Sequence, residues 1–281
     1  MIKTAQNTHP AHSHGSPAAW DEVYDNLDLS YSETANTQGK LFELVKIGFL
    51  SEIFPKRAKM LEVGCGTAFV SLYFAKRGYQ VHCLDINKSI LKVAEKNFNK
   101  EGVRGKFVVG DAEKLPFADN QFDIVVSFGL LEHFENPKVA VREMVRVLKH
   151  EALFFADIVP NRISCQTLGN LFNSLAAFGY WLFQGKPGLG LTKALRNFKP
   201  EYFENSISWQ EYKKIMSEAK LKKIQVRGNR PFPRLTLPKT LNYLYTLSLK
   251  PTIFIWKKFD RWNNFIPRMW GAGLWFWGYK S

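Results

Sequence analysis

The stretch Leu61-Glu-Val-Gly-Cys-Gly-Thr-Ala68 decides the fold, because a short apolar run leads there directly into a turn with two glycines. Residues 60–64 have the length and composition of a buried strand, and residues 69–77 have the apolar spacing of a helix. Glycines in such a turn let the backbone bend sharply and approach a ligand closely. The stretch therefore predicts a strand–turn–helix unit with a ligand site at the turn.

Short apolar runs continue to alternate with amphipathic segments after this unit. Further strands are predicted at residues 80–85, 106–109, 122–127 and 152–158, and further helices at 88–98 and 138–148. Strict alternation at these lengths indicates right-handed βαβ units and a parallel sheet. The predicted fold class is therefore α/β, with a doubly wound, Rossmann-like and mostly parallel sheet.

The domain boundaries follow from changes in composition. Residues 1–18 are polar and are expected to form a flexible tail, whereas residues 19–228 are expected to form the Rossmann-like domain. A lid insertion is expected at about 160–206, because residues 163–185 carry no charged side chain and place apolar residues at helical spacing. Residues 229–281 form a basic aromatic C-terminal segment, whose end alternates like a last, antiparallel strand of the sheet.

Charge is distributed unevenly along the chain. Of the net charge of +14, residues 196–281 carry +12, with 17 basic and 5 acidic side chains. This excess indicates an anionic partner, such as a phospholipid surface, a nucleic acid or an acidic substrate, or else a solubilising face.

The cysteine pattern bears on the cellular compartment. The three cysteines are widely spaced and form no CxxC pair, and the N-terminus has no signal-peptide pattern. We therefore expect a cytoplasmic protein without disulfides. The histidines near the N-terminus have no second cluster of ligands, so no metal site is expected.

An acidic residue follows each of the next two predicted strands. Asp85 lies 23 residues after Glu62, where a carboxylate accepts hydrogen bonds from both hydroxyls of a ribose. Asp111 follows the third strand, where it can accept from an exocyclic adenine amine. Dinucleotide binding is the natural competitor, but its G-x-G-x-x-G pattern needs a third glycine where this chain has Phe69. The bulky ring favours a nucleoside ligand without a pyrophosphate.

Several motifs together resemble one family, the class I S-adenosylmethionine-dependent methyltransferases. The resemblance is to their small-molecule branch, which includes the ubiquinone/menaquinone-type enzymes. It covers residues 20–158 well and the remainder poorly. The motifs are Glu62-Val-Gly-Cys-Gly-Thr67, Asp85, Gly110-Asp-Ala-Glu-Lys-Leu-Pro-Phe117, Phe122-Asp-Ile-Val125, Leu131-Glu-His133 and Arg146-Val-Leu-Lys149.

The resemblance implies a binding site for S-adenosyl-L-methionine. Glu62 is implied to organise the glycine loop and the methionine end of the cofactor, and Asp85 to hold the ribose. Asp111 with Ala112 is implied to contact adenine, and residues 127–130 to lie along the methionine moiety. The complete implied set is Glu62, Gly64, Cys65, Gly66, Asp85, Ile86, Asp111, Ala112, Ser127 and Phe128.

Two places depart from the family's pattern. Ala68 stands where the family usually has glycine, which narrows the loop by a methyl group and should still permit binding. His150-Glu-Ala152 replaces the common Pro-Gly-Gly turn before the fifth strand, which concerns architecture more than chemistry.

Methyl transfer demands few fixed catalytic residues, because holding donor and acceptor in line supplies much of the catalysis. If the acceptor is a hydroxyl, a base helps, and His133 lies near the end of the fourth strand. The alternative for His133 is a packing or helix-capping role. Asp157, which ends the fifth strand at the same sheet edge, is a second candidate for contacting the acceptor.

The expected function is methylation of a small or amphiphilic acceptor, such as a glycan intermediate, a lipid or a quinone-like molecule. Tryptophans interleaved with lysines and arginines over residues 232–277 suit a bilayer interface, so we expect a peripheral location at the inner face of an anionic membrane. The alternative is an RNA-directed methyltransferase or RNA-associated factor that uses the basic C-terminal third. No base-flipping motif supports that alternative. Intact Glu62, Asp85 and Asp111 argue against a third reading, a cofactor-binding protein without activity.

Overall fold

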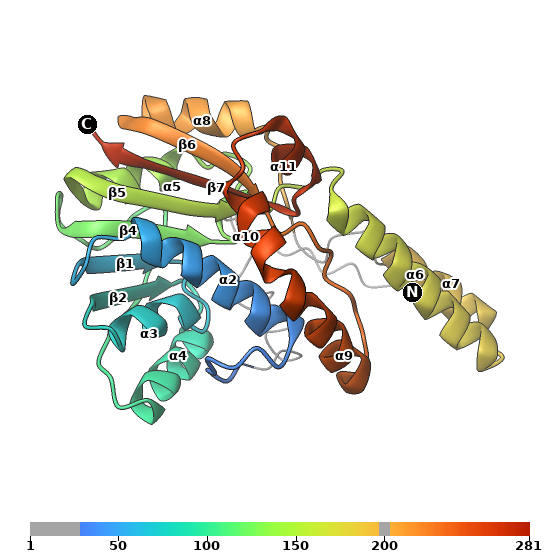
Figure 1. Ribbon diagram of the computed structural model, residues 1–281. Coiled ribbons are helices and arrows are strands. Elements are labelled where there is room, and N and C mark those ends of the chain that lie inside the picture. The colour runs from blue at the N-terminus through green and yellow to red at the C-terminus, as the bar shows by residue number, and fades with distance from the viewer. Residues whose placement is uncertain (1–28, 197–202) are drawn as a thin grey trace, which may run out of the picture.

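The computed structural model describes residues 29–196 and 203–281. Its centre is a seven-stranded sheet with strand order β3-β2-β1-β4-β5-β7-β6, flanked by helices on both faces (Figure 1). The predicted doubly wound, mostly parallel α/β fold is confirmed. The strands are β1 (Lys59–Val63), β2 (Gln80–Asp85), β3 (Lys106–Val109), β4 (Phe122–Phe128), β5 (Leu148–Ile158), β6 (Leu221–Asn229) and β7 (Gly273–Lys280).

The order of the strands reverses between β1 and β4, which are parallel neighbours. From β1 the chain moves outward to β2 and β3, and from β4 it moves in the opposite direction to β5. The connections that leave β1 and β4 therefore turn away from each other. This divergence leaves a crevice outside the carboxyl ends of the strands, where such folds bind their ligands.

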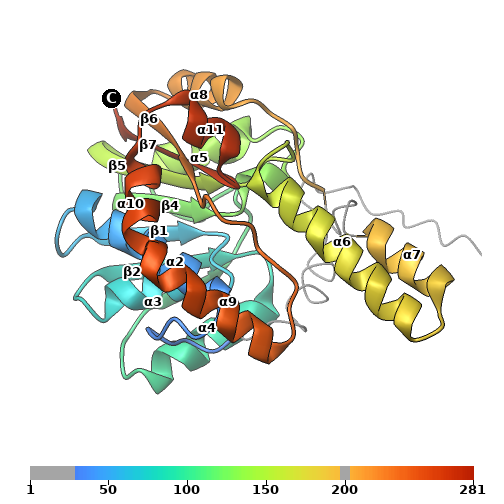
Figure 2. The ribbon, with the colours of Figure 1, turned by 45° about the vertical axis from the view of Figure 1, so that its right-hand side comes forward.

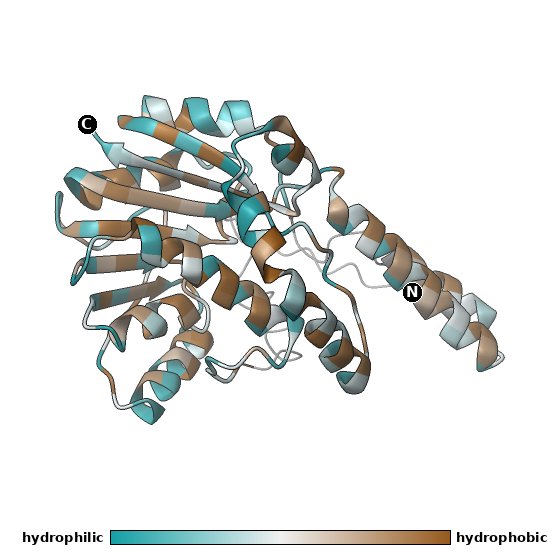
Figure 3. Cartoon of the chain, viewed as in Figure 1, coloured by the Kyte–Doolittle hydropathy of each residue, from teal (hydrophilic) through white to brown (hydrophobic). Residues whose placement is uncertain are grey.

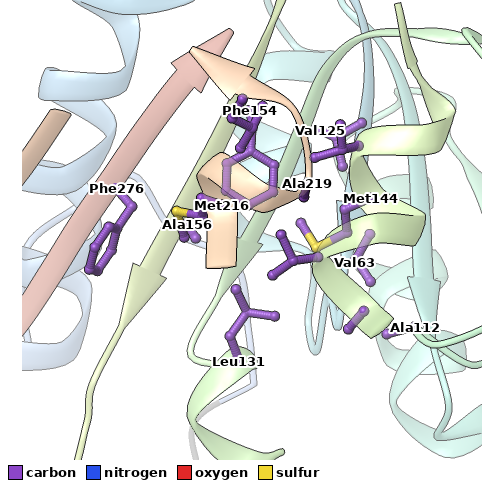
Figure 4. Close-up of a cluster of buried hydrophobic side chains, with 14 of the residues drawn as sticks. Val63, Ala112, Val125, Leu131, Met144, Phe154, Ala156, Met216, Ala219 and Phe276 are labelled. Atoms are coloured by element: carbon purple, nitrogen blue, oxygen red, sulfur yellow. The ribbon is translucent and has the colours of Figure 1, made fainter. Parts of the chain in front are cut away.

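Helices cover the two faces of the sheet in separate groups. One core cluster joins the sheet to α5 (Lys138–Val147) and α8 (Trp209–Glu218), and Figure 4 shows Met144 and Met216 within it. The other cluster joins the sheet to α2 (Gln38–Ile53), α3 (Phe69–Ala75) and α4 (Lys88–Lys100). Each helix turns an apolar stripe to the sheet, as the period of the sequence predicts.

The last strand of the chain lies inside the sheet. β7 is antiparallel to both of its neighbours, β5 and β6. Its side chains fill both cores, because Phe276 belongs to the α5–α8 side and Trp275 to the α2 side. The Trp275 ring stacks on Phe49 of α2 with 4.6 Å between the ring centroids.

A helical hairpin extends beyond the carboxyl ends of the parallel strands. It consists of α6 (Cys165–Phe183) and α7 (Pro187–Arg196), and we call it the arm (Figures 1 and 2). The Ser174 hydroxyl joins the two helices by donating to the carbonyl of Ala194 at 2.8 Å. A helix in this uncharged stretch is what the apolar spacing predicts, and a lid role stays a prediction. Within the described ranges, none of the helices combines the length and apolarity needed to cross a bilayer.

The C-terminal segment is folded onto the sheet through α9 (Lys239–Leu249), η2 (Lys250–Thr252), α10 (Ile253–Arg261) and α11 (Phe265–Trp270). Trp256 of α10 is fully buried, with Phe42 and Phe232 at centroid distances of 5.1 and 5.7 Å. The expectation that residues 232–277 form one exposed aromatic surface is therefore wrong for Trp256 and Trp275, whose rings fill the core against α2. The predicted flexible tail at residues 1–18 lies outside the described residues.

The burial of Trp256 predicts a large cost for its removal. Trp256→Ala should lower the free energy of unfolding by about 3–5 kcal/mol, because it leaves a cavity between Phe42 and Phe232. Trp262→Ala is the matched control, since this ring is 48% exposed, and should change the free energy by less than about 1 kcal/mol. Urea denaturation measures the free energy of unfolding of both variants. Equal losses in the two would contradict the burial of Trp256 between Phe42 and Phe232.

Candidate active site

A cavity of about 1010 Å³ lies at the carboxyl ends of β1, β2 and β4. One half, the donor half, is lined by the glycine loop and by the ends of β2 and β3. The other half, the acceptor half, is lined by α2, α6, α9 and the chain that follows β6. Residues that follow β4 also line the cavity: Phe128, Gly129 and Leu130 lie next to the glycine loop, and Glu132, His133 and Phe134 are counted with the acceptor half.

The glycine loop has a backbone that only glycine adopts easily. Gly64 and Gly66 have φ values of +66° and +52°. A Cβ atom on Gly64 would lie 2.8 Å from Cδ1 of Leu130, too close for a real contact. Ala68, which departs from the family's glycine, also lies in the left-handed region, with φ of +54°. The course of the loop past the cavity therefore depends on left-handed backbone conformations at these positions.

Glu62 ends β1 beneath this loop and is buried. Its Oε2 accepts hydrogen bonds from the backbone N–H of Ser71, at 3.1 Å, and from the Ser71 hydroxyl. Burial raises the pKa of Glu62 to about 7, although both of these hydrogen bonds favour the charged form. The carboxyl group thus ties β1 to the first turn of α3 and borders the donor half of the cavity.

Asp85 at the end of β2 fixes the loop from its other side. Its Oδ2 accepts from the N–H of Gly66 and its Oδ1 from the N–H of Asn87, both at 2.9 Å. Burial raises its pKa, while these backbone donors act in the opposite direction. Asp85 and Ile86 both line the cavity. A carboxylate held in this way is oriented before any ligand arrives.

The remaining predicted cofactor residues divide into two groups. Cys65, Ala112 and Phe128 line the cavity with those already described. Asp111 and Ser127 are not among its described lining residues. The Asp111 carboxylate accepts from the N–H of Glu113 at 2.8 Å, and Ser127 is buried in the sheet. Roles of Asp111 and Ser127 toward the cofactor stay predictions.

His133 lines the cavity at the end of the short helix η1 (Leu131–His133). The side chain is 5% exposed, and its Nδ1 donates to the carbonyl of Phe203 at 2.8 Å. Burial lowers its pKa, so the ring is neutral at pH 7. One ring nitrogen is thus committed to positioning the chain around Phe203.

Glu132, the neighbour of His133, was not among the residues predicted from the sequence. It is 2% exposed and lines the cavity. Its Oε1 accepts from the N–H of Val159 at 3.0 Å, whereas its Oε2 is buried without a hydrogen-bond partner among the described residues. Burial raises its pKa to about 7. In the sequence, the only signal for this site is an acidic residue shortly after the fourth strand. Which of its oxygens lacks a hydrogen bond depends on Val159, at the end of β5, and that contact is not visible in the sequence.

Asp157, the second predicted candidate, has a different environment. It is buried as deeply, and burial opposes its charged form, but Lys46 and Arg230 outweigh this and keep its pKa low. Lys46 Nζ lies 3.1 Å from its Oδ2, and Asn229 donates to its Oδ1 at 3.2 Å. Asp157 is therefore a paired charge that is absent from the described cavity lining, and its contact with the acceptor stays a prediction.

The acceptor half is roofed by residues 231–237, which we call the strap. Gln38 of α2 donates to the carbonyl of Leu235 and accepts from its N–H, at 2.6 and 2.8 Å. Gln166 of α6 makes the same pair of bonds with Arg234, at 3.0 and 2.8 Å. Amide side chains from two helices thus hold the strap as backbone partners would in a sheet.

Arg230, which directly precedes the strap, is one of the cationic residues in the described cavity lining, together with Lys40 and Arg234. Arg230 lines the cavity and has φ of +58°, a left-handed conformation that is uncommon for arginine. Its Nε donates to Oδ1 of Asn229 at 3.0 Å, and its Nη2 is buried without a partner among the described residues. Asn173 adds a third amide to the strap by accepting from the N–H of Thr236 at 2.8 Å. The acceptor half therefore offers a guanidinium and, in Glu132, a carboxyl oxygen.

The environment of Glu132 predicts a pH-dependent stability. Its folded pKa is raised to about 7 from 4.5, so the folded state keeps a proton that the unfolded state loses in this window. The stabilising contribution is full below pH 4.5 and is lost as the pH rises through 7. Glu132→Gln removes this loss, so the variant should gain about 3 kcal/mol over the parent protein between pH 5 and pH 8.

Urea denaturation at the two pH values tests this expectation. Glu135→Gln, on the same loop but exposed, is the control and should follow the parent protein. If Glu132→Gln loses as much stability toward pH 8 as the parent does, Glu132 is not a proton-holding group.

Comparison with known proteins agrees with this geometry. Residues 61–156 match the family described as methyltransferase domain. Ajmaline N-methyltransferase from Rauvolfia serpentina is 40% identical over 145 residues, which cover 44% of this chain and 50% of that protein. The ubiquinone/menaquinone biosynthesis C-methyltransferase UbiE from Azotobacter vinelandii is 40% identical over 97 residues, covering 32% and 38%. The chain thus spans half or less of the length of these two curated relatives.

The fold comparison extends over more of the chain. The crystal structure of YcgJ from Bacillus subtilis superposes with a TM-score of 0.51 at 20% identity and covers 84% of this chain and 97% of that one. The cofactor of the matched family is S-adenosyl-L-methionine. Residues 61–156 therefore belong to the class I S-adenosyl-L-methionine-dependent methyltransferases, with ubiquinone/menaquinone-type C-methyltransferases among their relatives.

Proposed function

We propose that this protein transfers a methyl group from S-adenosyl-L-methionine to a small or amphiphilic acceptor. One observation carries the proposal: a single cavity runs from the glycine loop to the strap. A donor bound in one half and an acceptor bound in the other would meet at residues 128–134. Confining both in one cavity supplies the proximity on which methyl transfer depends.

The donor half fits the cofactor on two grounds. Gly64 has no Cβ atom that would collide with Leu130, so the backbone of the loop can approach a ligand closely. Asp85 presents an oriented carboxylate to the cavity, suited to the hydroxyls of a ribose. Glu62, neutral or charged near pH 7, would organise the methionine end. When bound, the cofactor supplies an electrophilic methyl group, and the protein's part is to orient it and exclude water.

The acceptor half contains the groups that would manage a proton. An acceptor hydroxyl, amine or acidic carbon loses a proton as it gains the methyl group. Oε2 of Glu132 is buried and has no hydrogen-bond partner among residues 29–196 and 203–281. It belongs to a carboxyl group with a pKa of about 7, so it can take that proton at neutral pH. Arg230 would hold a neighbouring oxygen of the acceptor.

The names of the relatives leave the acceptor atom open, because one is an N-methyltransferase and the other a C-methyltransferase. We propose an acceptor with an apolar body and an oxygen-bearing head, such as a quinone-like molecule or a lipid. The polar groups that line the acceptor half support the head, and the exposed apolar side chains of α6 and α9 outside the cavity support the body.

An acceptor screen tests the function directly. Incubation with cofactor labelled in its methyl group should transfer label to phenolic or quinol lipids and not to water-soluble amines. Release of the demethylated cofactor product provides a second readout. Binding of cofactor without transfer to any member of a chemically broad panel would contradict the proposal.

Asp85 tests the cofactor site independently of the acceptor. Asp85→Asn should weaken cofactor binding by about 1.5–3 kcal/mol, the cost of losing a hydrogen bond to a charged group. Asp119→Asn, a carboxylate paired with Arg146, is the control and should leave affinity unchanged. Isothermal titration calorimetry measures both, and equal affinities of all three proteins would remove Asp85 from the site.

Glu132 and His133 make opposite predictions for catalysis. Glu132→Gln should lower turnover about 10²–10⁴-fold and abolish the rise of rate through pH 7, with cofactor affinity retained. His133→Gln should lower turnover less than about threefold, because its Nδ1 already serves Phe203. The reverse ranking would return the base role to His133, as predicted from the sequence.

A further inference from the structure

Exposed apolar side chains are concentrated in the last part of the chain. Of the 25 large apolar residues that are exposed within the described ranges, 23 follow residue 160. Most lie on the arm and on α9–α11, where Figure 3 shows apolar residues on the helices. We call them the apolar rim. Its members are Leu168, Leu171, Phe172, Leu175, Tyr180, Leu182, Phe183, Leu189, Leu191, Leu195, Leu241, Tyr243, Leu244, Leu247, Phe254, Ile255, Trp262, Phe265, Ile266, Met269 and Trp270.

The two parts of the rim are joined around the acceptor half of the cavity. The strap runs between α6 and α9 and is bonded to α6 through Gln166 (Figure 2). At the base of the arm, Nη1 of Arg162 donates to the carbonyl of Met269 in α11 at 3.0 Å. Asn170 of α6 and Asn242 of α9 line the cavity itself. Two of the helices that carry the rim, α6 and α9, therefore also form walls of the acceptor half.

The charges around the rim have one sign. No acidic residue occurs between Asp157 and Glu201, and Asp260 is the only one after Glu218. Asp260 is 1% exposed, so it contributes nothing to the surface. Exposed lysines flank the apolar side chains, namely Lys186, Lys193, Lys239, Lys257 and Lys258. Arg261 of α10 is paired with Glu52 of α2.

Exposed apolar side chains surrounded by positive charge distinguish between two kinds of partner for the rim, a second copy of the chain and a membrane. A symmetric contact with a second copy of the chain would set the same basic surface against itself, which is repulsive. The leaflet of an anionic membrane satisfies both features, since aromatic and aliphatic side chains enter the interface while lysines meet the headgroups. We propose that the apolar rim docks on an anionic membrane surface. This docking does not depend on methyl transfer. If the proposed function holds, docking also brings an amphiphilic acceptor to the cavity, and this second step rests on that function.

Vesicle co-sedimentation of the full chain tests the docking. The vesicles are phosphatidylcholine alone and phosphatidylcholine with about one third phosphatidylglycerol. Binding to the anionic vesicles should be stronger, and raising the salt from about 0.1 to 1 M should remove only the difference between them. Lys257→Gln with Lys258→Gln should weaken binding to anionic vesicles roughly 30-fold and leave binding to neutral ones unchanged.

Apolar variants and matched controls complete the experiment. Leu175→Ser with Phe183→Ser should weaken binding to both vesicles at least about tenfold. Two double variants outside the rim are the controls and should not change binding. They are Val109→Ser with Val139→Ser for the apolar changes, and Lys92→Gln with Lys96→Gln for the charge changes. Loss of binding only in the rim variants supports the proposal.

Three results would overturn it: no binding to either vesicle, dimers in light scattering that the rim variants dissociate, or salt-sensitive binding to RNA without lipid dependence. Cofactor affinity of the variants, measured by calorimetry, separates these outcomes from failure of the proposed function.

Discussion

The hydrogen bonds that β7 makes to β5 on one side and to β6 on the other join the parallel part of the sheet to its C-terminal part. Within the sheet β6 pairs only with β7, so its place beside the parallel strands depends on β7. The strap, α9, α10 and α11 all lie between β6 and β7 in sequence, so the pairing closes them into one loop against α2. The acceptor half of the cavity is therefore completed only when the C-terminus is in place. Such distant pairings are slow to form in folding.

Burial alone does not decide the charge of the carboxylates in this site. Glu62, Glu132 and Asp157 are all buried. Asp157 forms an ion pair with Lys46 and stays ionised, whereas at Glu62 and Glu132 burial outweighs the attraction of Lys46 and Arg230 and raises the pKa of each to about 7. The two glutamates border opposite halves of the cavity. Near neutral pH the charge of the cavity wall can therefore change at two separate positions.

Sequence reasoning was accurate where local pattern determines structure. The runs that form β2 and β3 were predicted with the observed bounds, because polar residues and turns delimit short apolar strands on both sides. The helices α9–α11 were not predicted, since prolines and aromatic residues obscure their period. Burial of Trp256 depends on Phe42, about two hundred residues away. Likewise, Glu132 and His133 are adjacent in sequence, and only Val159 and Phe203 decide which of them keeps a free polar atom.

The strap has a consequence for how its length can change. The three consecutive N–H groups of Arg234, Leu235 and Thr236 are each accepted by a different amide side chain, from Gln166, Gln38 and Asn173. Surface connections ordinarily tolerate insertions, because they are held only at their ends. Here adding or deleting one residue would shift all three pairs at once, because the three N–H groups are consecutive. The segment over the acceptor half is therefore a connection of fixed length, in which side-chain identity can vary more freely than the number of residues.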